Sequence, residues 1–334
     1  MKLFETASCT ALPAVPAELH DRILAAPRNS ETHRELMEQM EAMHLLEERW
    51  PSAASPLPAE FTVAAWNLER CLDPEGSTAL LKQHKPDIIL LSEMDAGMAR
   101  TAQRNTTADL AREMGMGYAY GVEFHEMDLG GETEREFCKD DYNAFGWHGN
   151  ALLSRTKPLK TALVRLDDHG HWFCPETSDD PAQPRVGGRM AVMAVIPTRG
   201  GDICAISTHL ESATDAPHRQ SQMDRLIAAA DAFAPGLPVI IGGDLNTGNH
   251  LPNADWQLET LFDSAKRQGF SWGNNLEGMT TRKSRITRWP TRAMKLDWFA
   301  CRGLKEHGAD IIPALDLTKT PLSDHELIVG QFSI

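Results

Sequence analysis

Six apolar runs of this chain end in a carboxylate, an amide or an imidazole, and this repetition constrains the fold more than any other feature. Such short apolar runs, bounded by polar residues, are typical of buried strands. Because sites in sheet proteins form where strands end, we expect these polar endings to meet in one pocket. One ending alone would usually be a helix cap or a turn. The six endings lie at residues 66–69, 91–93, 207–210, 242–246, 296–298 and 323–325.

From residue 61 onward, short β-rich runs are interspersed with stretches of helical periodicity. This mixture favours two sheets covered by helices over a barrel of eight even βα units. The polar segment 125–148 is predicted to form a long loop near one end of a sheet. Predicted strands cover residues 61–68, 87–92, 189–196, 203–210, 239–242, 296–300 and 327–332, and predicted helices cover residues 75–83, 105–114, 217–233 and 254–266.

Residues 1–60 differ in character from the rest, so we divide the chain into an N-terminal helical extension and a main domain, residues 61–334. One helix is predicted from Ser30 to residue 50, followed by a linker rich in Pro, Ala and Ser. The helix either packs on the main domain or binds a partner, and the sequence leaves both interpretations open. Its apolar stripe consists of Leu36, Met40, Met43, Leu46 and Trp50.

The chain has 334 residues and a net charge of −14, which disfavours binding to duplex nucleic acid. A basic tract at residues 280–295 nevertheless favours some polyanionic ligand. Its cations are Arg282, Lys283, Arg285, Arg288, Arg292 and Lys295.

The six cysteines are scattered without a CxxC pair, which indicates reduced thiols and a cytoplasmic protein. The first residues lack the apolar run of a signal peptide, and no stretch is long enough to span a membrane. The oligomeric state is left open by the sequence.

The polar endings also stand in a familiar order. The motifs WNxE, SEMD, GNALLS, STHLES, GGDLN, LDW and SDHE run through residues 61–334. In this order they resemble the endonuclease/exonuclease/phosphatase superfamily, while residues 1–60 match nothing in its pattern. The resemblance implies a four-layer α/β sandwich, in which helices flank two face-to-face mixed sheets. It also implies hydrolysis of a phosphate ester by in-line attack of water, with Mg²⁺ as cofactor and Mn²⁺ as a substitute.

The residue types at the first motifs suit a hard divalent cation, which prefers oxygen ligands. By resemblance Glu93 is the direct metal ligand, and Asn67 and Glu69 supply further oxygens. Asp324 is predicted to reach a second metal position.

Catalytic roles follow from the same resemblance and from the needs of phosphoryl transfer. Asp244 corresponds to the aspartate that activates or orients the water, and Asn246 to the amide that holds the phosphate. His325 resembles the site histidine, whose tautomer and orientation Asp297 should fix. His209 resembles the phosphate-contacting histidine of the phosphatase and sphingomyelinase branches.

Two further residues are predicted to contact substrate. Asn150 matches a substrate-contacting amide of the superfamily. Arg189 begins a strand, and a structural ion pair explains it equally well.

Together these features favour a phosphodiesterase or phosphatase acting on a small molecule or a lipid headgroup. The acidic segment 125–148 is expected to border the pocket and to repel an extended phosphate backbone. The alternative is a DNA repair nuclease or an enzyme resembling tyrosyl-DNA phosphodiesterases. A non-catalytic binding module on the same fold is a third, weaker interpretation, because all the catalytic residue types are present.

Overall fold

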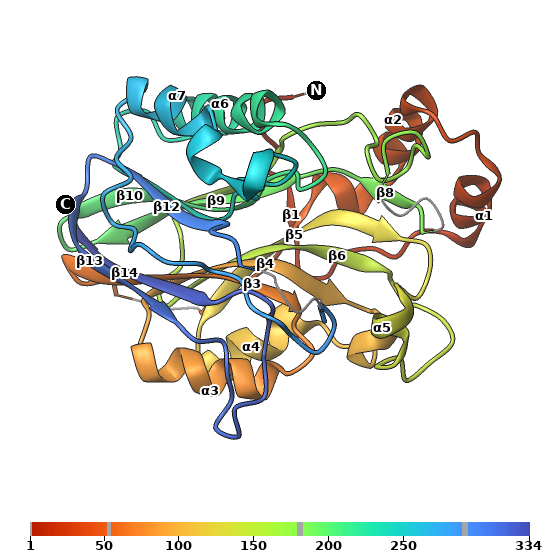
Figure 1. Cartoon of the computed structure of the whole chain (residues 1–334), viewed down its shortest axis with the longest axis horizontal. Helices are drawn as coiled ribbons and strands as arrows, with labels where there is room; N and C mark the ends of the chain where they lie inside the picture. The colour runs from red at the N-terminus through yellow and green to blue at the C-terminus, as the bar shows by residue number, and fades with distance from the viewer. Residues whose placement is uncertain (1, 52–54, 179–182, 289–292) are drawn as a thin grey trace.

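The computed structural model describes residues 2–51, 55–178, 183–288 and 293–334, and it has four layers (Figure 1). Helices α6 (Ala216–Phe233) and α7 (Leu261–Arg267) cover a five-stranded sheet. A nine-stranded sheet packs against that sheet, and helices α3 (Pro74–His84) and α4 (Thr106–Met114) cover its other face. The predicted α/β sandwich of two mixed sheets flanked by helices is therefore confirmed.

The larger sheet has the strand order β1-β2-β5-β6-β4-β3-β14-β13, and β8 pairs with β5. Its β3–β4 and β1–β2 pairs are parallel, and its other pairs are antiparallel. The strands are β1 (Ser8–Cys9), β2 (Leu46–Arg49), β3 (Glu60–Arg70), β4 (Ile88–Ala96), β5 (Gly117–Glu126), β6 (Trp147–Ser154), β8 (Arg185–Gly187), β13 (Lys305–Ile312) and β14 (Leu327–Ser333).

The smaller sheet has the order β12-β11-β10-β9-β7, and only its β10–β11 pair is parallel. Gly243 has a φ of +146°, and a Cβ there would lie 2.0 Å from the Thr208 carbonyl oxygen, so β10 and β11 can pair closely only with glycine at this position. The strands are β7 (Lys160–Arg165), β9 (Met190–Thr198), β10 (Gly201–His209), β11 (Val239–Asp244) and β12 (Asp297–Arg302).

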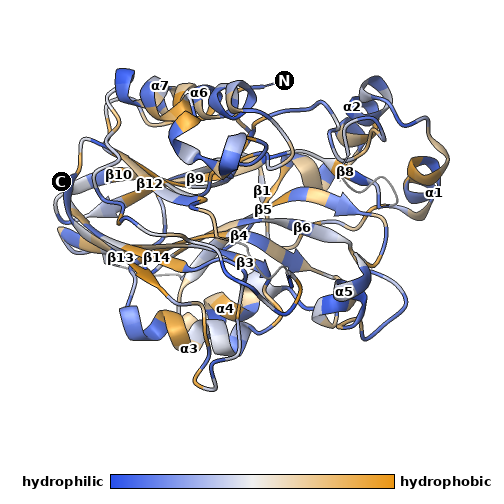
Figure 2. Cartoon of the chain, in the orientation of Figure 1, coloured by the Kyte–Doolittle hydropathy of each residue, from blue (hydrophilic) through white to orange (hydrophobic). Residues whose placement is uncertain are grey.

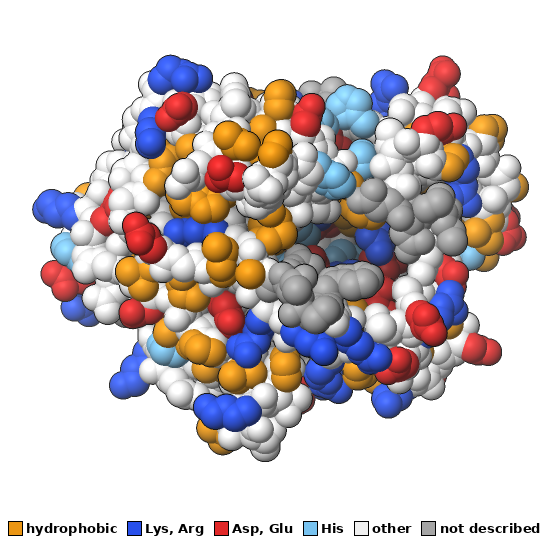
Figure 3. All heavy atoms as spheres, in the orientation of Figure 1, with side chains coloured by type: hydrophobic (Ala, Val, Ile, Leu, Met, Phe, Trp, Pro, Cys, Tyr) orange, Lys and Arg blue, Asp and Glu red, His pale blue; other side chains and the backbone are white. Residues whose placement is uncertain are grey.

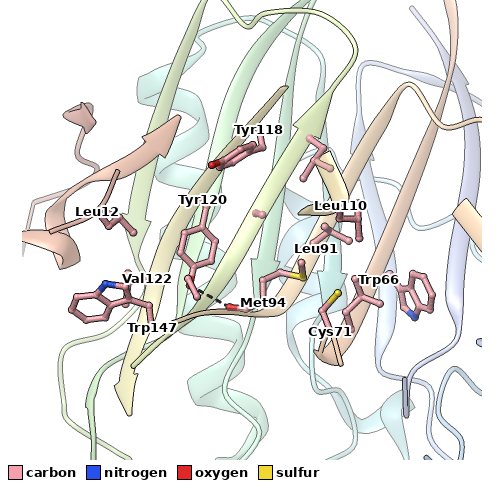
Figure 4. Close-up of a cluster of buried hydrophobic side chains, with 14 of the residues drawn as sticks. Leu12, Trp66, Cys71, Leu91, Met94, Leu110, Tyr118, Tyr120, Val122 and Trp147 are labelled. Atoms are coloured by element: carbon pink, nitrogen blue, oxygen red, sulfur yellow. Dashed lines mark hydrogen bonds between the residues drawn. The ribbon is translucent and has the colours of Figure 1, made fainter. Parts of the chain in front are cut away.

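Hydrophobic side chains fill the three interfaces between the layers. Figure 2 shows hydrophobic residues in the strands and in part of the helices, which also carry hydrophilic residues. Between the sheets, Val63 and Leu90 belong to one buried cluster with Val192 and Ile240. On the outer face of the larger sheet, Trp66 and Tyr120 are among the cluster drawn in Figure 4. Burial of this kind is the main stabilising contribution to such a fold.

The N-terminal segment corrects one prediction. The helix expected over residues 30–50 ends early: α2 spans Ser30–Gln39, a 3₁₀ turn covers Glu41–His44, and the chain then forms β2. Pairing with β5 satisfies the backbone of this segment at the sheet edge, and that tertiary gain overrides the helical pattern. Four residues of the predicted apolar stripe are nevertheless buried in the core: Leu36, Met40, Met43 and Leu46. An additional helix, α1, covers Ala17–Ala25.

The other differences from the prediction concern elements whose sequences show no clear hydrophobic periodicity. Every residue of β5 and β6 is buried, so neither strand shows the alternation that marks a half-exposed strand. The predicted loop 125–148 is shorter than expected, because β5 extends to Glu126 and β6 begins at Trp147, with α5 (Glu132–Arg135) between them. The predicted helix 254–266 consists of 3₁₀ turns followed by α7. The 3₁₀ turns of this region are Pro252–Ala254 and Trp256–Leu258, and another covers Ala99–Thr101.

The six cysteines carry free thiols, as expected. None of the helices in the described part of the chain combines the length and apolar character that crossing a bilayer requires. Residues 52–54 of the predicted linker and Arg292 of the basic tract lie outside the described residues.

Candidate active site

Strand register brings three of the predicted residues to one edge of the smaller sheet. His209 pairs with Asp244 across β10 and β11, and Asp244 pairs with Asp297 across β11 and β12. In the larger sheet, Asn67 pairs with Ser92 near the ends of parallel strands β3 and β4. The expectation that polar strand endings converge therefore holds for both sheets.

The end of β3 turns sharply at the site. Glu69, Arg70 and Cys71 have φ values of +44°, +77° and +57°, and the pairing of β3 with β4 shifts between Asn67 and Arg70. Three consecutive non-glycine residues in the left-handed region are unfavourable and persist only where the surroundings hold them. Ser323 contributes by donating a hydrogen bond to the Asn67 carbonyl at 2.6 Å. This turn places both Glu69 and Arg70 in the wall of the cavity described next.

A cavity of about 550 Å³ opens above these strand ends. Figure 3 shows a hollow on this face of the molecule, with acidic and histidine side chains inside it. The lining contains carboxylates, cations, histidines and two large aromatic rings. Its residues are Glu69, Arg70, Glu93, Phe124, His148, Trp172, Arg185, Arg189, His209, Ser212, Asp244, Asn246, Asn249, His250, Ile286, Thr287, Met294, Asp324 and His325.

Asp244 lies at the centre of the predicted catalytic residues. Its Oδ2 atom accepts a hydrogen bond from Asn67 Nδ2 at 3.0 Å and lies 3.5 Å from Nε2 of both His209 and His325. Its Oδ1 atom accepts from the backbone N–H of Asn246 at 2.8 Å. The carboxylate is buried and held from several sides, so it is fixed in orientation.

His325 is held by Asp297, whose Oδ2 lies 2.8 Å from Nδ1 of the ring. Burial alone would lower the pKa of His325, but the carboxylates of Asp297, Asp244 and Asp324 together raise it to about 10. Trp66 fixes the backbone here, because its Nε1 donates to the His325 carbonyl at 2.9 Å. At neutral pH the ring therefore carries a proton on both nitrogens.

His209 is the second histidine beside Asp244. Its Nδ1 lies 3.3 Å from Glu123 Oε2, and Arg189 Nη1 lies 2.9 Å from the same ring atom. Burial and Arg189 lower the pKa of His209, but Glu123 and Asp244 outweigh them and raise it above its ordinary value.

Glu93 is held between an amide and a guanidinium. Asn67 Nδ2 donates to its Oε1 at 3.0 Å, and Arg70 forms an ion pair with its other oxygen. Burial raises the pKa of Glu93, but Arg70 and the neighbouring histidines hold it well below its usual range. This carboxylate is therefore ionised and faces the cavity.

Glu69 contacts the basic tract. Ser284 Oγ donates to its Oε1 at 2.6 Å, and the backbone N–H of Thr287 donates at 2.9 Å. Burial, followed by the charge of Asp324, raises the pKa of Glu69 to about 8.

These donors fit a hard divalent cation. Glu69 and Asp324 are buried carboxyl groups, and a cation between them would offset the effect of Asp324 on the pKa of Glu69. Glu93 adds an ionised carboxylate, whereas the Asn67 oxygen accepts the backbone N–H of Glu69 at 3.0 Å. A second group, Asp244, Asp297 and His325, also brings one donor atom each within 4.8 Å. In this second group Asp297 is already engaged with Nδ1 of His325 at 2.8 Å.

Three other predicted residues differ in their surroundings. Asn246 lines the cavity, but its Nδ2 donates to the Leu210 carbonyl at 2.9 Å. Asn150 is fully buried outside the lining, and its Nδ2 donates to the Met190 carbonyl at 2.9 Å. Arg189 lines the cavity and also forms ion pairs with Glu123 at 2.5 Å and Glu211 at 3.2 Å. Its position therefore suits a substrate contact and a structural ion pair, the two alternatives left open by the sequence.

Sequence reasoning missed several residues of the lining. Arg70 directly follows Glu69 in a recognised motif, so its neighbourhood could have identified it. Trp172 and Arg185 carried no such signal, because they lie outside every motif. Glu123, which contacts His209 from outside the lining, was missed because β5 was not predicted. From the acidic segment 125–148, only His148 reaches the described lining.

Comparison with known proteins agrees with this geometry. Residues 64–325 match the Endonuclease/Exonuclease/phosphatase family. The chain belongs to this family, whose members are in general phosphoesterases and nucleases that depend on divalent metals. Among curated proteins, no sequence matches the chain.

Solved structures share the fold at low sequence identity. An endonuclease/exonuclease/phosphatase from Beutenbergia cavernae is 17% identical with a TM-score of 0.58, over 82% of this chain and 72% of that one. The catalytic domain of human Nocturnin with bound sulfate is 18% identical with a TM-score of 0.54, over 84% and 97%. A humanized D. rerio TDP2 is 16% identical with a TM-score of 0.51, over 83% and 100%.

Proposed function

We propose that this protein is a divalent-metal-dependent hydrolase that cleaves a small phosphate ester by in-line attack of water. One observation carries the proposal: the buried Asp244 carboxylate lies 3.5 Å from Nε2 of His325, and three further carboxylates line the same cavity. An acceptor for the proton of water, a donor for phosphate oxygens and oxygen ligands for a cation are what phosphate ester hydrolysis requires.

Each residue has a role in this scheme. Asp244 orients the attacking water and accepts its proton, because its position is fixed by Asn67 and Asn246. His325 donates from Nε2 to a phosphate oxygen, while Asp297 holds the other ring nitrogen. His209 and Arg189 place positive charge near the phosphate.

Glu93, Glu69, Asn67 and Asp324 are the residues that would hold Mg²⁺ or Mn²⁺. Such an ion supplies charge neutralisation and polarisation of the phosphate. Asn150 remains a proposal as a substrate-contacting residue, although its amide is engaged with Met190.

Net charge and cavity size favour a small substrate. The net charge of −14 opposes binding to an extended polyanion, and a cavity of about 550 Å³ accommodates a compact ester. The acidic segment 125–148 supports this less than expected. Glu126 and Glu134 are paired with Arg100, and Glu136 is paired with Arg288.

A nucleic-acid substrate is the second candidate, favoured by the basic tract at the mouth of the cavity. Ile286 and Thr287 of this tract line the cavity, and Lys283 and Arg288 are exposed beside them. Figure 3 shows Lys and Arg side chains gathered along this rim. The shared fold with TDP2 is compatible with this candidate.

The test compares kcat/KM for bis-p-nitrophenyl phosphate, p-nitrophenyl phosphate and an abasic DNA duplex, each with Mg²⁺ or Mn²⁺ at low and physiological salt. We expect metal-dependent turnover of a small ester that Asp244→Asn abolishes, and weak, salt-insensitive use of the duplex. Preference for the duplex by orders of magnitude, with a steep salt dependence, would establish the nuclease instead. Absence of turnover on every substrate and metal would contradict the proposed function.

A further inference from the structure

One wall of the cavity adjoins Arg189, whose guanidinium carbon lies 5.5 Å from the centre of the Phe124 ring and 5.9 Å from that of Trp172. It is formed by Trp172, Arg185 and Phe124, which no step of the proposed chemistry uses. The cavity of about 550 Å³ is much larger than a phosphate group, so the alcohol part of the substrate has room beside this wall.

Arg185 has an unusual environment in this wall. Its side chain is only 14% exposed, and its guanidinium carbon lies 5.1 Å from the centre of the Trp172 ring. Its nearest carboxylate oxygen belongs to Glu126, 3.5 Å from Nε. The other oxygen of Glu126 is taken by Arg100 at 2.7 Å. Among the described residues, the guanidinium of Arg185 donates no hydrogen bond.

A nearly buried guanidinium with unused donors is costly unless a ligand satisfies it. The planar fork of arginine matches phosphate and carboxylate groups. Arg189, in contrast, has its donors occupied by Glu123, Glu211 and Ser212. Arg185 is therefore the cation of this wall that has donors to spare for a ligand.

The wall is rigidly supported. Trp172 Nε1 lies 3.1 Å from both carboxylate oxygens of Glu211, which fixes the ring. The backbone N–H of Arg185 donates to the Trp172 carbonyl at 3.2 Å, and β8 pairs with β5. Helix α2 of the N-terminal segment supports β8 from outside, because His33 Nε2 accepts the N–H of Gly187 at 3.0 Å.

We propose that Arg185 binds a second anionic group, phosphate or carboxylate, on the alcohol part of the substrate, with the Trp172 ring packing against the carbon frame between the two groups. This inference rests on the proposed function and extends it: the substrate is a compact phosphate ester with two anionic ends. Arg185 and Arg189 both lie near the Trp172 ring, and a fixed guanidinium beside the phosphate position selects such a substrate over a neutral alcohol.

The test uses three phosphonates of similar length, which the enzyme cannot hydrolyse. Propylphosphonate has one anionic end, 4-phosphonobutanoate adds a carboxylate, and propane-1,3-bisphosphonate adds a second phosphonate. Binding is measured by calorimetry at saturating Mg²⁺, and inhibition of bis-p-nitrophenyl phosphate hydrolysis is measured in parallel. We expect a ligand with two anionic ends to bind about ten- to a hundredfold more tightly than propylphosphonate, as a charge-assisted contact implies.

Arg185→Gln should abolish this preference while propylphosphonate binding stays within about twofold, and Arg185→Lys should keep part of it. Arg199→Gln removes the same charge from the exposed turn that follows β9 and should keep the full preference. Melting temperatures verify that the variants fold. If only the bisphosphonate binds more tightly than propylphosphonate, the second group is a phosphate. If 4-phosphonobutanoate gains equally, Arg185 accepts either a phosphate or a carboxylate.

Two results would overturn the inference: no preference in the wild type, or a preference that Arg185→Gln leaves intact. Metal chelation by the bisphosphonate would give the second result, since it does not depend on Arg185. Failure of the proposed function looks different, because the binding preference would persist without turnover of any phosphate ester.

Discussion

Nδ1 of His325 lies 2.8 Å from Oδ2 of Asp297, and the opposite nitrogen of the ring faces Asp244 at 3.5 Å. The ring thus bridges two carboxylates that are direct neighbours in the register of β11 and β12. A histidine held in this way acts as one unit with its carboxylate, and this has a measurable consequence.

Asp297→Asn and His325→Ala should each lower kcat, and the double variant should lose little more than His325→Ala alone. Asp297 acts by orienting and charging the ring, so it has nothing to act on once the ring is absent. The measurement is a double-mutant cycle in kcat/KM at saturating metal. Independent, additive losses would contradict the pairing as a functional one.

Asp244→Asn should lower kcat by about 10²–10⁴, the usual worth of a positioned base. The substitution keeps the shape of the side chain but removes the acceptor for the proton of water. Asp231→Asn on the exposed end of α6 is the matched control and should retain wild-type kcat. Unchanged turnover in Asp244→Asn would exclude this residue as the base.

Glu93→Gln should raise the metal concentration needed for half-maximal activity and weaken metal binding by calorimetry. The amide keeps the size of the side chain but loses the ligand charge and the ion pair with Arg70. Glu136→Gln removes the exposed charge that pairs with Arg288, and it should leave metal binding unchanged. Equal metal affinity in both variants would remove Glu93 from the ligand set.

His125 should make the fold sensitive to mild acid. Burial, assisted by His20, lowers the pKa of His125 from 6.5 to about 4. Because the folded pKa lies below the unfolded one, the stability it contributes is present above pH 6.5. That stability is lost as the pH falls from 6.5 through 4, by at most about 3 kcal/mol. His125→Gln should therefore flatten the fall in unfolding free energy between pH 7 and pH 4.5, compared with the wild type in denaturant titrations. A parallel fall in both proteins would contradict this assignment.

Met43→Ala should lower the free energy of unfolding by about 2–5 kcal/mol, because this side chain is fully buried in the core of the larger sheet. Leu24→Ala in α1 is the control: that side chain is 51% exposed, and its loss should cost little. If both changes were equally mild, the N-terminal segment would be only loosely attached.

The sequence alone predicted the parts of the fold where polar residues interrupt buried strands. The ends of β3, β4, β10 and β11 were recognisable because each apolar run stops at a polar candidate residue, and the start of β12 was recognisable because Asp297 precedes its apolar run. Their convergence followed from the general rule that sites form at strand ends. Strands β9 and β14 were recognised from their apolar runs alone. Strands β5 and β6 were missed because both are buried throughout, so their sequences lack the alternation of a half-exposed strand.

The contacts around each site residue could not be predicted from the sequence for a different reason. The contacts of Glu123 with His209 and of Ser284 with Glu69 join segments 86 and 215 residues apart, and no local pattern encodes them. The helix predicted over residues 30–50 failed for the same kind of reason, because pairing with β5 outweighed helical spacing.

The register of β10, β11 and β12 also links catalysis to folding. His209, Asp244 and Asp297 stand side by side only when three strands from distant parts of the chain have found their exact partners. A slip of one residue in any of them would turn its side chain to the opposite face of the sheet. Contacts between such distant segments form slowly. Recovery of activity during refolding should therefore report the completed sheet, after bulk secondary structure has already returned.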